Sequence, residues 1–318
     1  MQIRLSPRLL MPLCVVAGIV VIIPSSTAKD DGYWNLSFTK SLPSCSMCHS
    51  SATTNGAVTI DLSGPQSISV GQNANYSLQI NSSVGATKNE GGFTVSTTSG
   101  TLAAGANSRL KNGMLSHAND KQRKWSFGFS NTTTGLTEWF AVGLAADGNG
   151  STSGDALGFY GPDGKVPGTP YRIFVNDTQV TPYGTACAGT SGFKPILGAA
   201  ANATRGSNFK VELHNARPGS VALGGLGVSD KAFGPLPLPF SLAVLGAAGC
   251  QLNASLDIIQ TLPTTGTGAG NGTATWSWPI PNETRFKGAT IFFTTLVVDL
   301  GVNKLGMVNS NGLKAVVQ

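Results

Sequence analysis

Short runs of alternating apolar and polar residues, each ended by Gly, Pro or Asn, recur along the whole chain. Successive side chains of a β-strand point to opposite faces, so this alternation is typical of strands with one buried face. Residues 57–62 (AVTIDL) and 76–80 (YSLQI) are clear examples. Charged residues make up only 11% of the chain, Gly is abundant with 41 residues, and no helix-length periodic segment occurs. The sequence therefore predicts an all-β fold of short strands and many turns.

The chain of 318 residues is long enough for two domains, each with its own core. A first series of strand-like segments is followed by GPDGKVPGTP, which has the clearest linker composition in the chain. A second series starts with YRIFVN at residue 171. We therefore expect two antiparallel β-sandwich domains of the immunoglobulin-like kind in tandem, at residues 29–162 and 171–318, with a linker at residues 163–170.

Residues 1–28 have the features of an export signal. Arg4 and Arg8 precede an apolar stretch from Leu9 to Ile23, and Ser26-Thr27-Ala28 offers small residues for cleavage. The mature protein is thus expected in the periplasm, at the cell surface or outside the cell. The alternative is an uncleaved membrane anchor, because the apolar stretch is near the short limit for a span. The net charge of +6 is not gathered in a basic run, so no nucleic-acid partner is expected.

The pentapeptide Cys45-Ser46-Met47-Cys48-His49 has the form Cys-x-x-Cys-His. In such a motif two thiols three positions apart form thioethers with one haem, and the next imidazole is the proximal iron ligand. The chain has only five Cys and three His, so a chance match is rare. The alternatives are a redox-active Cys-x-x-Cys pair, which lacks a thioredoxin-like context, a zinc site, which lacks further ligands nearby, and a plain disulfide. We favour one covalent haem c.

The second axial ligand decides the chemistry of such an iron. His117 lies in residues 111–120, which we expect to be a polar loop of the first domain, and Met114 lies three residues before it. We favour His49 and His117 as a bis-histidine pair, which has a lower reduction potential than His with Met. Met114 is the alternative ligand, and a surface loop position is the alternative for His117. His214, in the second domain, is expected to be a solvated strand residue and is not assigned.

If Cys45 and Cys48 hold haem, Cys187 and Cys250 are left to pair with each other in an oxidising compartment. Such a disulfide would connect distant parts of the second domain. Cys14 lies within the export signal and would leave with it.

The loop DGNGSTSGD at residues 147–155 has oxygen-bearing side chains at alternate positions and resembles a calcium loop. Its candidate ligands are Asp147, Asn149 and Asp155. The acidic residue that would complete an EF-hand loop is replaced by Gly158. We therefore favour a turn held by its own Asx hydrogen bonds, with a weak calcium site as the alternative.

Taken together, these features resemble known families of exported proteins. Over roughly residues 42–160 the chain is similar to the choice-of-anchor V domain, a secreted reeler-like β-sandwich. The resemblance is carried by the Cys-x-x-Cys-His motif, NGAV at 55–58, GGF at 91–93, His117, WSF at 125–127 and the DGNGSTSGD loop. It implies export and a haem-type motif.

The second half is similar to a C-terminal module of exported bacterial proteins of unknown role. The matching segments are YGTACAG at 183–189, LPLPF at 236–240, Gly249-Cys250 and PIPN at 279–282. This resemblance implies the same pairing of Cys187 with Cys250.

The sequence thus predicts an exported monohaem electron-transfer protein that works with a redox partner and has the capacity to self-associate at the cell surface. The alternative function is an extracellular structural or adhesive sandwich in which Cys45 and Cys48 form a disulfide and no haem binds. An enzyme is not expected, since no hydrolase-type constellation is recognisable. Peroxidase-like chemistry would require an open sixth position on the iron.

Overall fold

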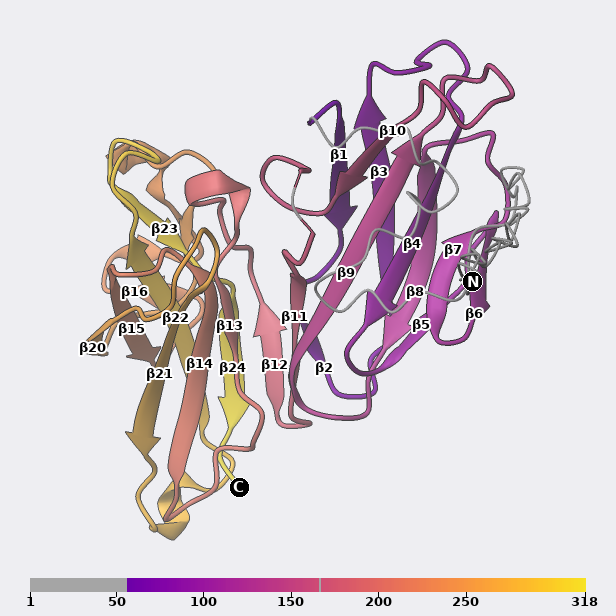
Figure 1. Ribbon diagram of the computed structural model, residues 1–318. Coiled ribbons are helices and arrows are strands. Elements are labelled where there is room, and N and C mark those ends of the chain that lie inside the picture. Colours follow the sequence, from indigo (N-terminus) through magenta and orange to yellow (C-terminus); the bar gives the residue numbers. More distant parts are fainter. Residues whose placement is uncertain (1–55, 166) are drawn as a thin grey trace, which may run out of the picture.

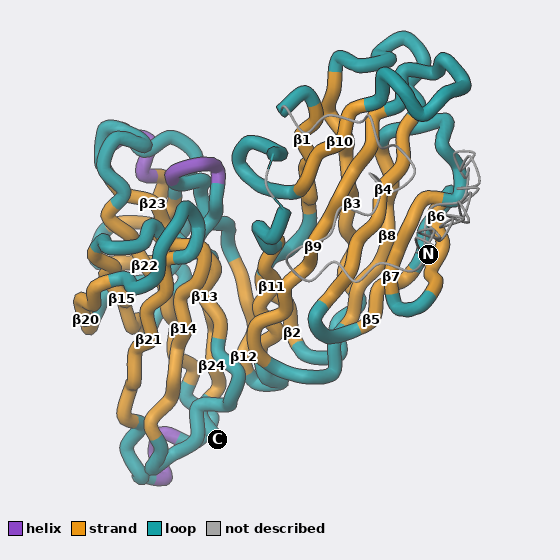
Figure 2. The backbone as a smooth tube through the Cα atoms, viewed as in Figure 1, coloured by secondary structure: helices purple, strands orange, loops and turns teal. Residues whose placement is uncertain are grey.

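The computed structural model describes residues 56–165 and 167–318, mostly as strands and turns. The described part contains three short 3-10 elements, η2 (Thr190–Gly192), η3 (Leu242–Leu245) and η4 (Thr284–Phe286). Its strands form two sandwiches that lie side by side (Figure 1, Figure 2). The predicted all-β class is confirmed. Within the same residues, no helix is long and apolar enough to cross a membrane.

The first sandwich packs a four-stranded sheet against a seven-stranded sheet. The four-stranded sheet has the order β1 (Val58–Ser63), β3 (Ala74–Ser82), β8 (Lys124–Ser130) and β5 (Thr101–Ala103). The seven-stranded sheet has the order β2 (Ser67–Ser69), β11 (Tyr171–Asn176), β9 (Gly135–Ala145), β4 (Gly91–Thr97), β7 (Met114–His117) and β6 (Ser108–Lys111), and β10 (Ala156–Phe159) also pairs with β9.

Strict alternation builds the core of the first sandwich. On β3, Tyr76 and Leu78 are buried and the residues that alternate with them are more exposed. The neighbouring strand β8 has the same pattern, with Trp125 and Phe127 buried. The indole of Trp139 on β9 closes the core from the opposite sheet, 4.6 Å from the ring of Tyr76. This pattern is the one that the alternating segments of the sequence predicted.

The predicted boundary between the two domains is wrong. β11, the YRIFVN segment, pairs antiparallel with β9 and parallel with β2, so it is a central strand of the first sandwich. Residues 163–170 therefore join two strands of one sheet and are not an interdomain linker. The first sandwich ends at Asn176. Composition misled the prediction because a Gly- and Pro-rich loop looks the same within a domain as between domains.

The second sandwich packs a six-stranded sheet against a three-stranded sheet. The larger sheet has the order β12 (Val180–Tyr183), β24 (Gly312–Val316), β22 (Thr290–Val298), β15 (Val221–Gly227) and β20 (Ile258–Pro263), and β23 (Met307–Asn309) also pairs with β22. The smaller sheet has the order β13 (Ile196–Gly198), β14 (Asn208–Ala216) and β21 (Gly272–Pro279). Two small ribbons pair β16 (Ala232–Phe233) with β17 (Leu236–Pro237) and β18 (Phe240–Ser241) with β19 (Gln251–Leu252).

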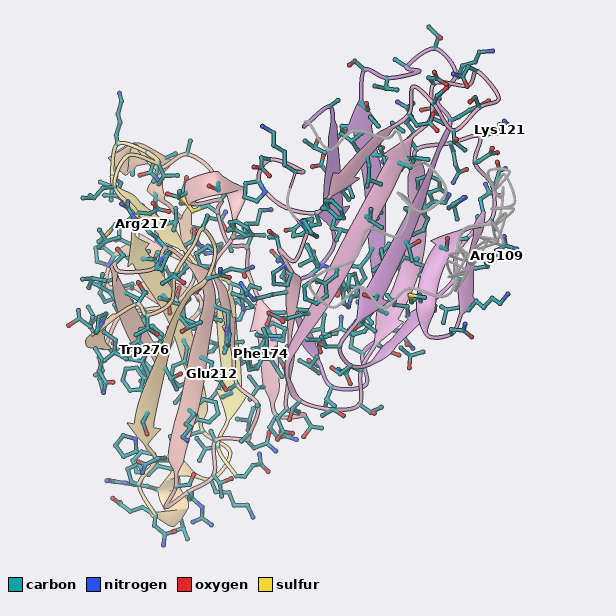
Figure 3. All side chains as sticks on the ribbon, viewed as in Figure 1. Arg109, Lys121, Phe174, Glu212, Arg217 and Trp276 are labelled. Atoms are coloured by element: carbon teal, nitrogen blue, oxygen red, sulfur yellow. A yellow bond between two sulfur atoms is a disulfide. The ribbon has the colours of Figure 1, made fainter. Side chains whose placement is uncertain are left out.

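Side chains of β11 join the two sandwiches. Phe174 lies at the junction of the two sandwiches (Figure 3). Its ring fills the space that a side chain at position 198, a glycine, would need. The ring centroid is 5.6 Å from that of His214. His214 also lies 3.4 Å from a carboxylate oxygen of Glu212. The expectation of a solvated strand histidine is therefore wrong, because the first sandwich covers this face of β14.

Candidate functional site

The residues predicted to attach haem, Cys45, Cys48 and His49, lie outside the described residues, as do the export signal and Cys14. The description begins at Gly56, two residues before β1. The described residues therefore test only the surroundings of the two predicted second ligands, which lie on β7.

His117 and Met114 lie on β7 and not in a polar loop as expected. β6 and β7 form a hairpin whose register pairs Lys111 with Met114 and leaves Asn112 and Gly113 as a two-residue turn. Both turn residues have positive φ, 52° and 75°, as a type I′ turn requires. Asn-Gly between two short strands is the sequence signal for such a hairpin. The surrounding polar residues concealed it, because only part of this strand faces the core.

Met114 belongs to a buried apolar cluster on the outer side of the seven-stranded sheet, opposite the sandwich core. Alternation assigns the two sides: Leu115 of β7 and Trp139 of β9 belong to the core, and their neighbours Met114 and Phe140 point the other way. We call this cluster the outer apolar face; it consists of Met114, Phe140, Val142, Leu144, Leu157 and Phe159. None of these side chains is more than 8% exposed.

The strands that carry the outer apolar face pack mainly within their own sheet and across the core. β9 makes its main contacts with its sheet neighbours and with β1 and β3 across the core, and β10 with β9 and β1. Exposing six such side chains to water would cost on the order of 10 kcal/mol, comparable to the stability of a whole domain. The face therefore has the character of a covered surface.

The imidazole of His117 lies at the edge of the outer apolar face. A Cβ on Gly92 would come 2.5 Å from His117 Cε1, so the ring occupies the space beside this glycine. Gly92 is the direct cross-strand partner of Leu144, and such partners point to the same face of a sheet. The ring centroid also lies 6.4 Å from that of Phe93 and 6.5 Å from that of Trp125, which are core residues, so the imidazole lies beside the end of β4, between the core and the outer apolar face.

Backbone groups of β4 fix the orientation of the His117 ring. Its Nδ1 lies 3.1 Å from the backbone N of Phe93 and 3.3 Å from the carbonyl O of the same residue. Nδ1 accepts from the N–H in one tautomer and donates to the carbonyl in the other. Metal-ligating histidines are oriented in this way, through the nitrogen that does not bind the metal.

Two side chains here, His117 and Met114, are of the kinds that ligate haem iron. A haem presents a broad apolar ring, and its iron takes imidazole or thioether ligands. The outer apolar face consists of aliphatic and aromatic side chains and includes the Met114 thioether. The His117 imidazole lies at its edge, beside Gly92. The sequence identified the two candidate ligands but not the apolar cluster beside them.

The loop predicted as a turn or a calcium site is held by its own hydrogen bonds. The Asn149 backbone N–H donates to Asp147 Oδ1 at 3.0 Å, and its side-chain amide donates to Asp147 Oδ2 at 2.8 Å. Asp155 Oδ1 accepts from the Asp147 backbone N–H at 3.0 Å. These are the Asx bonds that the favoured interpretation predicted. In the described part of the chain, no group of three or more His, Cys, Asp or Glu side chains is arranged to hold a metal ion.

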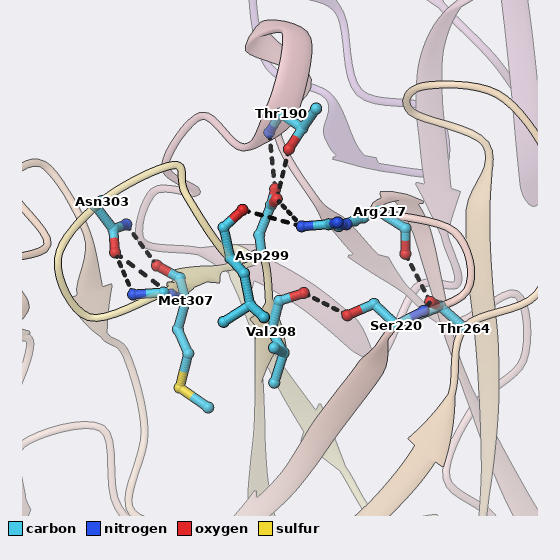
Figure 4. Close-up of polar contacts among 10 residues, drawn as sticks. Thr190, Arg217, Ser220, Thr264, Val298, Asp299, Asn303 and Met307 are labelled. Carbon is cyan, nitrogen blue, oxygen red and sulfur yellow. Dashed lines mark hydrogen bonds and ion pairs between the residues drawn. The ribbon is translucent and has the colours of Figure 1, made fainter.

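Cys187 and Cys250 form a disulfide, as predicted, with their Cα atoms 4.9 Å apart. It ties the segment after β12 to the β18–β19 ribbon. Three residues further on, the backbone N–H of Thr190 donates to Asp299 Oδ2 at 2.7 Å, and Arg217 Nη1 lies 3.4 Å from Asp299 Oδ1 (Figure 4). The disulfide and this buried carboxylate together hold the segment in place, which is a structural role.

A cleft of about 640 Å³ lies between the two sandwiches. Its walls carry aromatic rings and amides, with Lys194 as the charged residue, and include Tyr160, Tyr171, Tyr183 and Phe193. Burial raises the pKa of Tyr160 to about 12, so its hydroxyl is neutral at physiological pH. The sequence did not point to this cleft, because its walls come from segments far apart in the chain.

Comparison with known proteins adds little to this geometry. No model of a protein family matches the chain, and a search of the curated proteins gave no match. Among solved structures, the chain is similar to that of Salmonella alpha-2-macroglobulin reacted with methylamine, with 12% sequence identity and a TM-score of 0.23. The similarity covers 92% of this chain and 16% of the length of that one.

Proposed function

We propose that this protein is an exported electron carrier with one haem c, attached through Cys45 and Cys48 and ligated by His49. The observation that carries the proposal is the attachment motif in a chain whose first sandwich also offers an oriented imidazole beside a buried apolar face. Neither feature alone is specific to haem. Their combination supplies the attachment, the second ligand and the apolar surroundings that such a cofactor requires.

A haem iron with two protein ligands exchanges one electron without binding a substrate. The residues of this chain have three roles in that function. His117 would ligate the iron, the backbone of Phe93 would hold the imidazole ring, and the outer apolar face would exclude water and so set the potential. We assign no catalytic residue and propose that electrons pass to and from a separate redox partner outside the cytoplasm.

His117 is the proposed second ligand and Met114 the alternative. The two residues are three positions apart on an extended strand, which separates their Cα atoms by about 10 Å. Only one of them can therefore reach a given iron. His117 is preferred because hydrogen bonds fix its ring, whereas Met114 packs among apolar side chains as a core residue would.

The test is an optical spectrum of the mature protein produced with a haem c maturation system, followed by a pyridine haemochrome assay after denaturation. We expect a c-type spectrum at one haem per chain that is lost in Cys48→Ala. The matched control is Cys187→Ala with Cys250→Ala, which should keep the haem. A colourless protein with a Cys45–Cys48 disulfide would reject the proposal and favour a structural or adhesive role.

A further inference from the structure

The cleft between the two sandwiches has a size and a place that are typical of a ligand site. Its volume is about 640 Å³. Small-molecule sites range over about 300–1,000 Å³ and often form where two domains meet. One wall comes from the first sandwich, within residues 62–72 and at Tyr160 and Tyr171, and the other comes mainly from residues 181–186 and 192–196 of the second. The proposed function makes no use of this cleft.

Interactions around the cleft hold its two walls in place. The Ser67 hydroxyl of the first sandwich donates to the Leu197 carbonyl of the second at 3.1 Å. The disulfide and the hydrogen bond from Thr190 to Asp299 anchor residues 183–196, which form much of the second wall (Figure 4). A site whose walls are fixed before binding loses little conformational entropy when a ligand enters.

The strand edges at the cleft do not favour the addition of an extended peptide. Asn311 closes the edge of β13, because its Oδ1 accepts from the Leu197 N–H at 2.9 Å and its Nδ2 donates to the Leu197 carbonyl at 3.0 Å. At β2, Gln72 Oε1 accepts from the Ser69 N–H at 2.9 Å. On β12, Pro182 has no N–H to donate. A peptide that extends a sheet requires free backbone groups at such edges.

Polar groups of buried and half-buried residues at the cleft remain without a hydrogen-bond partner in the described part of the chain. They include the Tyr160 hydroxyl, Gln66 Oε1 and Asn215 Nδ2. The other amide atoms hold two of these side chains, since Gln66 Nε2 donates to the Arg172 carbonyl at 3.1 Å and Asn215 Oδ1 accepts from the Arg172 guanidinium at 3.2 Å. Asn215 is only 3% exposed. The cleft thus offers a donor, an acceptor and a hydroxyl that can act as either.

Aromatic rings form the apolar part of the cleft. The Tyr183 ring lies across Gly312, its partner on the neighbouring strand, because a Cβ there would be 2.6 Å from Tyr183 Cζ. Tyr183 is only partly buried, so the ring face away from Gly312 is available to the cleft. Lys194 is charged, and none of the described residues that line the cleft is acidic. The cleft therefore suits an uncharged ligand with both apolar and hydroxyl surfaces.

We propose that this cleft binds a neutral oligosaccharide. A sugar ring has an apolar face of C–H groups, which packs on an aromatic ring, and hydroxyls that both donate and accept hydrogen bonds. The Tyr183 ring meets the first requirement, and the free groups of Tyr160, Gln66 and Asn215 meet the second. This inference goes beyond electron transfer and does not depend on haem.

A proline-rich peptide is the other ligand that aromatic grooves bind. Its backbone offers carbonyl acceptors, which need donors from the protein. The hydroxyls of Tyr171 and Tyr183 are not available for this, because they donate to the carbonyls of Gly64 and Asn253 at 3.0 and 3.1 Å. The cleft therefore favours the sugar, and the peptide becomes an outcome of the test.

Isothermal titration calorimetry of the mature protein tests the proposal. The probes are the neutral hexasaccharides cellohexaose, maltohexaose, laminarihexaose and N-acetylchitohexaose, with a polyproline peptide and polygalacturonate for comparison. We expect saturable binding of at least one neutral hexasaccharide, and weaker or no binding of the peptide and the acidic polysaccharide. The haem-free Cys45→Ala, Cys48→Ala variant should bind the same hexasaccharide equally well.

Substitutions place the ligand in the cleft. Thr181→Trp puts an indole into the cleft at an exposed strand position, and it should abolish binding while the fold is kept. Thr261→Trp, at an exposed position of β20 outside the cleft, is the matched control and should bind as the unaltered protein does.

A second pair of variants removes one hydroxyl each. Tyr160→Phe removes a free hydroxyl and should lower the affinity about fivefold, the effect of one lost hydrogen bond. Tyr183→Phe removes a hydroxyl that is bonded to Asn253 within the protein, so the affinity should not change. Equal affinities for the two variants would contradict the assignment.

The remaining outcomes also decide the matter. Absence of saturable binding to every neutral hexasaccharide would overturn the proposal, as would tighter binding of the polyproline peptide. Binding that survives Thr181→Trp would overturn it as well, because the ligand would then lie elsewhere. A colourless protein that binds a hexasaccharide in this way would reject electron transfer and leave the present inference standing.

Discussion

The imidazole of His117 occupies the space that a side chain on Gly92 would fill, since a Cβ there would lie 2.5 Å from His117 Cε1. Gly92 has no positive φ that would strain an alanine, so the cost of Gly92→Ala comes from displacing this ring. We expect the substitution to destabilise the protein by about 1–3 kcal/mol. In the haem-loaded protein it should also alter the spectrum, because the ring leaves the position fixed by Phe93.

A double-mutant cycle checks this relationship. In a His117→Ala background the obstruction is gone, so Gly92→Ala should cost less than about 0.5 kcal/mol in chemical denaturation. Gly128→Ala, whose Cβ would meet only Ala103 at 3.3 Å among side chains, controls for the effect of adding a methyl group. Equal costs for Gly92→Ala in both backgrounds would show that the two residues do not interact.

The second axial ligand can be identified by substitution. His117→Ala should open the sixth position, so that the ferrous protein binds carbon monoxide and the low-spin spectrum is lost. Met114→Ala should leave the axial ligation intact and cost about 2–4 kcal/mol of stability, since it removes a buried side chain. The reverse result, with ligation lost only in Met114→Ala, would identify the thioether as the ligand and predict a higher potential.

The fold class followed from the sequence because alternation in a strand depends on local spacing alone. The segment YSLQI predicted one buried face, and Tyr76 and Leu78 of β3 do lie in the core. The boundary at Tyr171 could not be read in the same way. Whether a strand belongs to the sheet before it or after it depends on pairing, and β11 pairs with β9 and β2 of the first sandwich.

The candidate site shows the same limit. His117 and Met114 were identified by residue type, because few side chains can ligate iron. Their apolar surroundings come from β9 and β10, more than 20 residues further along the chain, since Phe140 is 23 residues after His117. The strand order that brings Leu144 and Leu157 near β7 through β4 is a tertiary property. In the sequence these residues look like ordinary core positions, since alternation does not say which face of a strand will be covered.

Removing the disulfide should destabilise the second sandwich selectively. Cys187 and Cys250 are 63 residues apart, and closing a loop of that length stabilises a fold by about 4 kcal/mol in the chain-entropy account. Cys187→Ala with Cys250→Ala should lower the free energy of unfolding by about this amount. Urea denaturation followed by tryptophan fluorescence measures it, and a reductant should have no further effect on the double variant.

Arg172 should couple the two sandwiches. Its Nε lies 2.9 Å from Glu138 Oε1 in the first sandwich, and its guanidinium donates to Asn215 Oδ1, Gly270 O and Asn271 Oδ1 in the second, at 3.2, 2.8 and 2.8 Å. Arg172→Lys keeps the charge but cannot make this set of bonds. We expect a loss of about 2–3 kcal/mol and two separate unfolding transitions.

The control for Arg172 is Arg285→Lys. Arg285 pairs with Glu283 at 2.7 Å but is 72% exposed, so its replacement should change stability by less than about 0.5 kcal/mol. Calorimetry on both variants distinguishes the two cases. A single, unshifted transition for Arg172→Lys would mean that apolar packing around Phe174 alone joins the sandwiches.

Intact-mass spectrometry of the denatured mature protein tests the central claim most directly, because a covalent cofactor stays with the chain when the fold is lost. The account predicts a mass higher than that of the polypeptide by one haem, and loss of that increment in the Cys45→Ala, Cys48→Ala variant. A mass equal to the polypeptide with Cys45 and Cys48 joined in a disulfide, after production with a haem c maturation system, would contradict it.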